Sequence, residues 1–423
     1  MQAGFAEIDI TPPIGTRKIG WLKEIIGTCV LDPLFARAAA LDDGTQRIGF
    51  IQLDLLSIRW TQVNRIRQRI SAELDFPGEN VMIAATHNHA GPAVANTGDV
   101  ARDETYIARL EDRCVAVFAD ALRALDSAEY ALGSAMEPDL AFNRRMIMRD
   151  GTVMTQRKLS IEALGLEGPA DHEVGLLAVR DKNHALKGCI VNFTCHPVHH
   201  GGEDVFSAGY PGVLAALMKQ RGCPATLFLN GASGNIIYRD PLKGVSHSKE
   251  TIGRRLADCV TGMLAELAWR REMRLGAARR TIQVPFRDPT EDQIRGTARG
   301  AQRFIDPAIY DRGMPALCKK IRERGANPAE VQALFMEDHA WLGIPGEYFV
   351  EHGLRIKEKT WPMRTWIVGQ ANGMLGYLPT RQAFERGGYE TTFAGFSRMA
   401  PEAGDLLADA AIDLINQNLD RKI

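Results

Sequence analysis

The chain has 423 residues, of which 45% are hydrophobic and 24% are charged, so it can bury a large core. Its 51 lysines and arginines nearly balance its 52 aspartates and glutamates, which excludes a global field that would attract nucleic acid or an anionic membrane. No apolar run is long enough to span a bilayer. We therefore expect a small-molecule substrate, no nucleic-acid partner and no stable membrane insertion, and the composition allows a homo-oligomer.

Two further features bear on the cellular compartment. Residues 1–10 do not show the basic, apolar and small-residue pattern of a signal peptide. The seven cysteines are scattered and are never spaced C-x-x-C, so they indicate neither a disulfide framework nor a thiolate zinc site. Both features favour a reduced, cytoplasmic protein.

The first half of the chain alternates strand and helix patterns. Apolar runs at residues 36–41 and 47–56 flank an Asp-Gly turn and predict a hairpin. Apolar residues at helical spacing predict helices over residues 61–75 and 101–127. Between the two helices, an apolar run from residue 80 ends in Thr-His-Asn-His-Ala-Gly-Pro, which predicts a buried strand. This alternation predicts an α/β fold with a mixed β-sheet core and flanking helices.

The second half continues the pattern. It predicts strands over residues 173–180, 187–195, 226–230 and 365–370 and helices over residues 212–220, 248–269, 348–357 and 401–419. Residues 142–149 form a basic segment that no periodicity explains, and we interpret them as a loop. Residues 286–340 are richer in charge and predict polar helices, such as one over 328–339, that form a lid or subdomain. With no flexible linker visible, we expect residues 1–423 to form one domain.

Histidines gather at two predicted strand ends. Five of the ten fall in two short segments: His87, His89, His196, His199 and His200. Alternate side chains of an extended segment point the same way, so His87 and His89 are expected to project together. Neutral imidazole is a preferred zinc ligand, and strands of one sheet bring their ends together. The pattern predicts a strand-end metal site; the alternative is a set of turn histidines that cap backbone carbonyls.

A histidine zinc site usually takes a carboxylate as well. Glu347, which follows a Pro-Gly turn, is the best single candidate. Alternatively, Glu347 is a favourable charge at the N-terminus of the helix predicted from residue 348. Asp54 and Asp171 compete for the same role.

Two other segments carry candidate substrate-binding residues. The turn Gly-Ala-Ser-Gly-Asn after the strand at 226–230 could present backbone N–H groups to a ligand, which makes Asn230, Gly231 and Ser233 candidates. Ser233 does not lie in Gly-x-Ser-x-Gly, so serine catalysis is disfavoured. Arg144 either polarises a carbonyl or oxyanion or, like Arg145, is a solvated surface charge.

Taken together, these motifs resemble the neutral/alkaline, non-lysosomal ceramidase family. The matching segments cover most of the chain in the family order: residues 3–15, 32–37, 86–92, 143–144, 192–197, 207–212, 230–235, 345–347 and 376–377. Each motif is weak alone, whereas the ordered set is specific.

The resemblance implies a zinc-dependent amidase in which His87, His196, Glu347 and Tyr377 are the metal ligands. It further implies that His89 is a second, non-ligating histidine and that His89 and Arg144 stand over the scissile amide.

One motif departs from the family. Members often show Ser-Ala-Asp-Tyr-Pro-Gly where this chain has Gly209 in place of the acid, so we expect a small or medium N-acyl substrate rather than ceramide itself. Alternatives are an esterase, phosphatase or glycoside-cleaving hydrolase that uses the same metal site, or a metal-stabilised binding protein.

Overall fold

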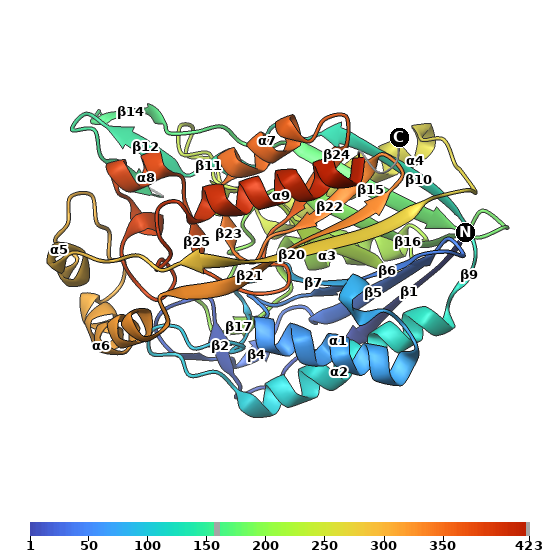
Figure 1. Cartoon of the computed structure of the whole chain (residues 1–423), viewed down its shortest axis with the longest axis horizontal. Helices are drawn as coiled ribbons and strands as arrows, with labels where there is room; N and C mark the ends of the chain where they lie inside the picture. The colour runs from blue at the N-terminus through green and yellow to red at the C-terminus, as the bar shows by residue number, and fades with distance from the viewer. Residues whose placement is uncertain (156–160, 420–423) are drawn as a thin grey trace.

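The computed structural model describes residues 1–155 and 161–419. They form a mixed α/β fold with helices on the outside of three larger sheets, which confirms the expected fold class (Figure 1). Among the described residues, no helix combines the length and apolar character needed to cross a membrane.

The first sheet has the strand order β7-β6-β5-β1-β9. Its strands are β1 (Gln2–Asp9), β5 (Phe35–Asp42), β6 (Arg47–Leu53), β7 (Val81–Ala85) and β9 (Asp126–Ser127). Helices α1 (Trp60–Leu74) and α2 (Glu104–Arg123) pack on one face, along the lower edge of Figure 1. Asp103 caps the N-terminus of α2, since its carboxylate accepts a hydrogen bond from the N–H of Tyr106. The helix buries the apolar face that its spacing predicts.

The second sheet has the order β10-β15-β16-β18. Its strands are β10 (Glu129–Met136), β15 (Glu173–Arg180), β16 (Leu186–Phe193) and β18 (Thr226–Asn230). Helices α3 (Gly209–Gln220) and α4 (Lys249–Glu266) pack against each other and cover this sheet.

The third sheet has the order β20-β21-β22-β24 and corrects part of the sequence interpretation. Its strands are β20 (Leu275–Pro285), β21 (Ala326–Met336), β22 (His339–Gly343) and β24 (Arg364–Val368), covered by α7 (Val350–Lys359) and α9 (Ala403–Leu419). The helix predicted over residues 328–339 is therefore wrong. Glu330 and Gln332 look like the polar face of a helix, but both are buried in the strand, where they accept hydrogen bonds from Arg67 at 2.7 and 2.9 Å. These bonds offset the cost of burying polar groups.

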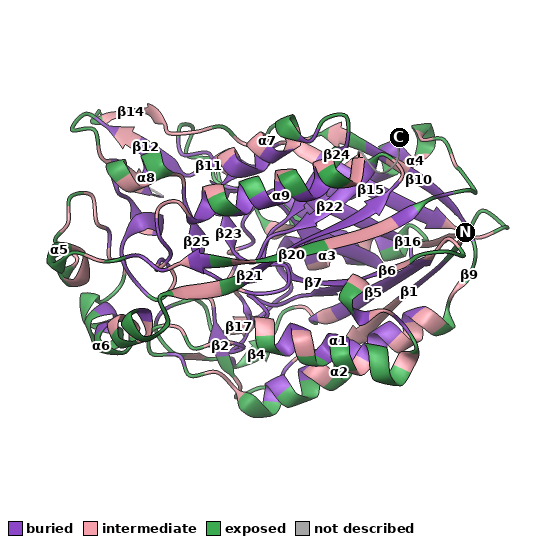
Figure 2. Cartoon of the chain, viewed as in Figure 1, coloured by how far each residue is buried: buried purple, intermediate pink, exposed green. Residues whose placement is uncertain are grey.

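The inner faces of the three sheets meet in one shared core, visible as the buried strands in Figure 2. Phe50 of β6 packs edge-on against Trp341 of β22 with ring centroids 5.3 Å apart. Trp341 in turn contacts Trp366 of β24 at 5.2 Å, and Leu177 and Leu229 add the second sheet to the same cluster. Aromatic edge-to-face packing of this kind adds stabilisation beyond the buried area alone.

Each large sheet contains one parallel strand pair: β6 with β7, β16 with β18 and β22 with β24. The loops that follow these strands gather at one place. The N–H of Ala85 donates to Gln370, and the N–H of Gly369 donates to the carbonyl of Asn230. The topology thus brings the segments after β7, β16, β18 and β24 together, which is where ligand sites form in sheets of this kind.

Shorter elements surround this convergence. The segment interpreted as a loop at 142–149 instead forms β11 (Phe142–Asn143) and β12 (Arg145–Met148), paired with β13, β14 and β19. The remaining short strands are β2 (Arg17–Ile19), β3 (Ile25–Ile26), β4 (Cys29–Val30), β8 (Gly91–Pro92), β13 (Val153–Thr155), β14 (Ala163–Leu166), β17 (Val205–Phe206), β19 (Ile236–Ile237), β23 (Glu347–Tyr348) and β25 (Tyr377–Leu378). The remaining α-helices are α5 (Glu291–Arg295), α6 (Pro307–Arg324) and α8 (Arg381–Arg386). Figure 1 shows α5 and α6 at the end of the molecule opposite the N-terminus.

Candidate metal centre

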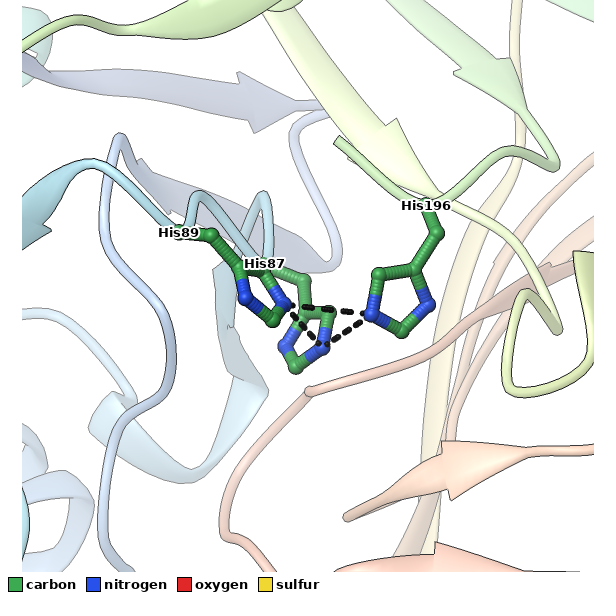
Figure 3. A group of neighbouring side chains, drawn as sticks. All are labelled: His87, His89 and His196. Carbon is green, nitrogen blue, oxygen red and sulfur yellow. Dashed lines mark hydrogen bonds between the residues drawn. The ribbon is translucent and has the colours of Figure 1, made fainter. Parts of the chain in front are cut away.

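Three imidazole rings converge at the strand ends (Figure 3). His87 and His89 follow β7, and His196 follows β16. The Nε2 atoms of His87 and His196 lie 3.0 Å apart, and the Nε2 of His89 lies 3.2 and 3.1 Å from them. This confirms that the two histidine segments meet and that the resulting cluster can hold a metal ion.

The other nitrogen of each ring is held by a backbone carbonyl. The Nδ1 of His87 lies 2.9 Å from the carbonyl oxygen of Leu56, and that of His89 lies 2.8 Å from Gly20. The Nδ1 of His196 lies 3.2 Å from the carbonyl oxygen of Ser233. A carbonyl only accepts, so each Nδ1 carries the proton and each neutral ring turns an Nε2 lone pair toward the common point.

The local backbone differs from the extended segment expected on the sequence. His87 has φ of 68°, so the chain turns through the left-handed region immediately after β7. The side chain of Asn88 fixes this turn: its amide donates to the carbonyl of Ser207 at 2.7 Å, and its oxygen accepts from the N–H of Ala90 at 3.0 Å. His87 and His89 do lie together, but a turn rather than strand alternation places them.

Glu347 of β23 brings a carboxylate to the same point. Its Oε2 lies 3.2 Å from the Nε2 of His87 and 3.8 Å from that of His196. This oxygen is buried and has no hydrogen-bond partner among the described residues. With every Nδ1 protonated, the Glu347 carboxylate faces the Nε2 lone pairs of His87 and His196 without a donor between them, an arrangement that a bound cation stabilises.

The surroundings favour neutral rings. The pKa values of His89 and His196 are well below the ordinary value for histidine, mainly because both rings are buried. The positive charge of Arg144 lowers both pKa values further. Neutral imidazole is the form that binds metal. The donor set of imidazole and carboxylate therefore fits a zinc ion.

Tyr377 and Arg144 lie beside Glu347. Tyr377 of β25 is the parallel neighbour of Glu347 in β23. The Nη2 of Arg144 donates to the hydroxyl of Tyr377 at 3.1 Å and to the carbonyl of Gly234 at 2.8 Å. Burial and the nearby Glu347 raise the pKa of Tyr377 well above its ordinary value although Arg144 opposes them, so the phenol keeps its proton.

Arg144 and Arg145 are buried, so the alternative of solvated surface charge is excluded. Both pair with one carboxylate that the sequence did not indicate, Glu390: its Oε1 accepts from the Nε of Arg144 at 2.8 Å and its Oε2 from Arg145 at 2.7 Å. Burial alone would raise the pKa of Glu390, yet the two guanidinium groups hold it below the usual value. No local signal could reveal Glu390, because its partners are some 246 residues away in the chain.

The predicted glycine turn, residues 230–235, contacts segments that carry the candidate metal ligands. The amide of Asn230 donates to the carbonyl of Thr86 at 3.1 Å, which ties the ends of β18 and β7 together. Gly231 packs against Thr194, and a Cβ there would lie 2.0 Å from the Thr194 hydroxyl. Ser233 orients His196 through its backbone carbonyl. These contacts position the centre, and direct contact with substrate stays a prediction for all three residues.

The competing candidates lie elsewhere. Asp54 is buried against Arg37 at 2.9 Å, and Asp171 pairs with Lys357 at 2.6 Å. His199 stacks on Tyr238, with ring centroids 3.8 Å apart. Glu347 itself lies in β23 rather than at a helix N-terminus, so it is the carboxylate that the fold brings to the histidines.

Fold and site together define a mixed α/β protein with a buried candidate metal centre at its strand ends. Solved structures of ceramidases share this architecture. The crystal structure of neutral ceramidase from Pseudomonas aeruginosa matches with a TM-score of 0.75 and 17% identity, covering 99% of this chain and 74% of that chain. A structure of ceramidase complexed with C2 matches with a TM-score of 0.77 and 18% identity, covering 99% and 75%.

The chain therefore has the neutral ceramidase fold, as the sequence resemblance predicted. Comparisons with family models and with curated protein sequences give no match.

Proposed function

We propose that this protein is a zinc-dependent hydrolase that cleaves the amide bond of an N-acyl compound. The observation that carries the proposal is the convergence of three Nε2 atoms at one point, with the unpartnered Oε2 of Glu347 beside those of His87 and His196. The similarity to structures named as ceramidases supports amide cleavage. Glycine at position 209, where members of the family often have aspartate, favours a substrate other than ceramide.

His87, His196 and Glu347 would hold the metal. Imidazole nitrogen and carboxylate oxygen suit zinc, and among the described residues the candidate ligand group contains no cysteine. A zinc ion held there supplies Lewis-acid chemistry to a carbonyl substrate. The carbonyls of Leu56 and Ser233 keep the two histidines in the ligating tautomer.

His89 and Tyr377 divide the remaining roles. In the arrangement expected from the sequence, Tyr377 is a metal ligand and His89 accepts and returns a proton at Nε2. The carbonyl of Gly20 holds the Nδ1 of His89. The convergence of the rings instead favours His89 as a third imidazole ligand. Zinc content of His89→Asn and Tyr377→Phe separates the two arrangements: the variant that loses zinc identifies the ligand.

Arg144 would stabilise negative charge that develops on the carbonyl oxygen. It is fixed by Glu390 and by the carbonyl of Gly234, so its guanidinium is positioned before substrate arrives. Arg144 also donates to the hydroxyl oxygen of Tyr377, which leaves the phenol proton free to be donated elsewhere.

A metal-dependent phosphoesterase is a second candidate, because positively charged side chains line a cavity next to the centre. One panel distinguishes the two: protein stripped with a chelator and reloaded with zinc is assayed on matched N-acyl amides, carboxylic esters, phosphomonoesters and glycosides. We expect hydrolysis of the amides, its loss on stripping and its return with zinc. Turnover of phosphomonoesters alone, or amide hydrolysis that survives stripping, would contradict the proposal.

A further inference from the structure

A cavity of about 370 Å³ lies beside the candidate metal centre. Its volume is within the range of about 300–1,000 Å³ that is usual for small-molecule sites. Three contacts show that it adjoins the centre. Leu56, in the cavity wall, holds His87 through its carbonyl; Gly376, also in the wall, accepts from the N–H of Glu347; and Phe396 packs against Tyr377 with ring centroids 6.0 Å apart.

One wall of the cavity is apolar. Helix α6 contributes Ile309, Met314 and Leu317, and Leu22 belongs to the same hydrophobic cluster as Ile309. Such a wall suits hydrocarbon, which gains free energy when it leaves water. Helix α6, part of the segment interpreted as a lid, thus forms part of the cavity wall.

The same cavity is lined by three cations, Arg59, Lys320 and Arg398, and by no aspartate or glutamate of the described chain. None of the three forms an ion pair with a described carboxylate, whereas most arginines of the protein do. Glu104 acts on Arg59, but that carboxylate is paired with Arg102. The cations act on one another instead: Arg398 and Arg59 both help to lower the pKa of Lys320, after burial, to about 8.

Two further observations show that positive charge is unbalanced here. The Nη groups of Arg398 donate to the carbonyls of Gly395 and Met374, but its Nε is buried and has no partner among the described residues. Helix α1 begins at this wall, since Arg59, Trp60 and Thr61 all line the cavity, and no acidic residue lies in its first turn. The free N–H groups of a helix N-terminus favour a bound anion.

We infer that the substrate carries a carboxylate, which binds Arg59, Lys320 and Arg398 while the amide lies at the metal centre. This inference rests on the proposed function, because it names the class of N-acyl compound that the same site takes. The carboxylate belongs either to the amine part, as in an N-acyl amino acid, or to the acyl part, as in the amide of a dicarboxylic acid. A neutral N-acyl amine lacks the group that the three cations would neutralise.

Binding to metal-free protein tests the inference without relying on hydrolysis. Calorimetric titration compares N-lauroylglycine and the glutaric-acid monoamide of decylamine with neutral N-lauroylethanolamine. We expect at least one of the two carboxylates to bind at least about tenfold more tightly than the neutral compound, since hydrogen bonds to charged groups are the stronger ones. The tighter of the two carboxylates shows which part of the substrate carries the charge.

Variants assign the effect to the cavity. Lys320→Met and Arg398→Met are each expected to reduce the preference for carboxylate by about fivefold or more, while Lys319→Met, on the exposed side of α6, keeps it. Thermal unfolding checks that each variant is folded, and Lys320→Met still tests the inference if Arg398→Met is unstable.

Equal affinity for charged and neutral compounds, or a preference that survives in the folded Lys320→Met variant, would overturn the inference. The proposed function fails separately, if zinc-loaded protein hydrolyses neither charged nor neutral N-acyl compounds.

Discussion

Two groups of cationic side chains lie beside the candidate metal centre. They differ in whether a carboxylate of the protein neutralises them. Arg144 and Arg145 are buried and share the carboxylate of Glu390 at 2.8 and 2.7 Å. Arg59, Lys320 and Arg398 line the cavity without an ion pair to a described carboxylate. Taking a charge out of water costs free energy unless a partner compensates it, so the first group is part of the folded structure. The second group keeps its charge available for a ligand.

This difference predicts opposite effects on stability and binding. Removing a partner from the first group should destabilise the fold, because it leaves charge buried and unpaired. Removing a cation from the second should leave the fold unharmed and weaken anion binding.

The largest effect is expected for Glu390→Ala. The substitution leaves two buried guanidinium groups without their shared carboxylate, and we expect the free energy of unfolding to fall by about 3–5 kcal/mol. Urea unfolding measures the loss. The control is Glu323→Ala, which removes an exposed partner of Lys319 and should change stability by less than about 1 kcal/mol. Equal losses in both variants would show that the buried ion pairs of Glu390 contribute no more to stability than an exposed pair does.

Arg144→Met comes next. Its positive charge would be missing where the oxyanion develops, and we expect kcat on N-acyl substrates to fall about a hundredfold or more. Glu390 keeps Arg145 as a partner, so the variant should remain folded. Steady-state kinetics with zinc-loaded protein give the change. A variant with wild-type kcat would remove Arg144 from catalysis.

Lys320→Met tests whether the cavity cations contribute to the stability of the fold. Because Lys320 has no carboxylate partner and is repelled by Arg398, Arg324 and Arg59, its loss should leave the free energy of unfolding at pH 7 within about 0.5 kcal/mol of wild type or raise it. Urea unfolding of the two proteins side by side provides the comparison. A clear loss of stability would mean that Lys320 has a structural partner.

The smallest effect concerns pH. Burial lowers the pKa of Lys320 to about 8 with help from Arg398, Arg324 and Arg59, so the side chain is charged below that pH and neutral above it. The preference for carboxylate substrates, measured as a ratio of kcat/KM against the matched neutral compound, should therefore decline as pH rises through about 8. In Lys320→Met the ratio should be flat. A ratio that rises with pH in wild type would contradict this role.

Much of the fold follows from local pattern. The Asp-Gly turn and its flanking apolar runs became β5 and β6, and the stripe on α2 lies in the core. The local pattern did not predict strand β21. Its polar residues Glu330 and Gln332 are buried against Arg67 of α1, which lies some 263 residues away in the chain. A polar residue whose partner is distant in sequence looks like a surface residue.

The site shows the same limit. His87 and His196 stand out because they cluster with other histidines after apolar runs, and the fold brings them together. The convergence of His89 with them depends on the left-handed turn at His87, which a strand pattern cannot show. Glu390 and the cavity cations carry no local signal, since each acquires its role only from side chains that the sheets and α6 place beside it.

The central claim is that His87, His196 and Glu347 hold a metal ion on which amide hydrolysis depends. The most direct measurement is metal content per chain, by mass spectrometry, in wild type, His196→Asn and His200→Asn. The two variants change the same residue type in one segment, but only His196 turns its Nε2 to the centre, while His200 contacts Glu203. We predict about one zinc per chain in wild type and in His200→Asn, and its loss from folded His196→Asn. Full zinc content in His196→Asn would contradict the account.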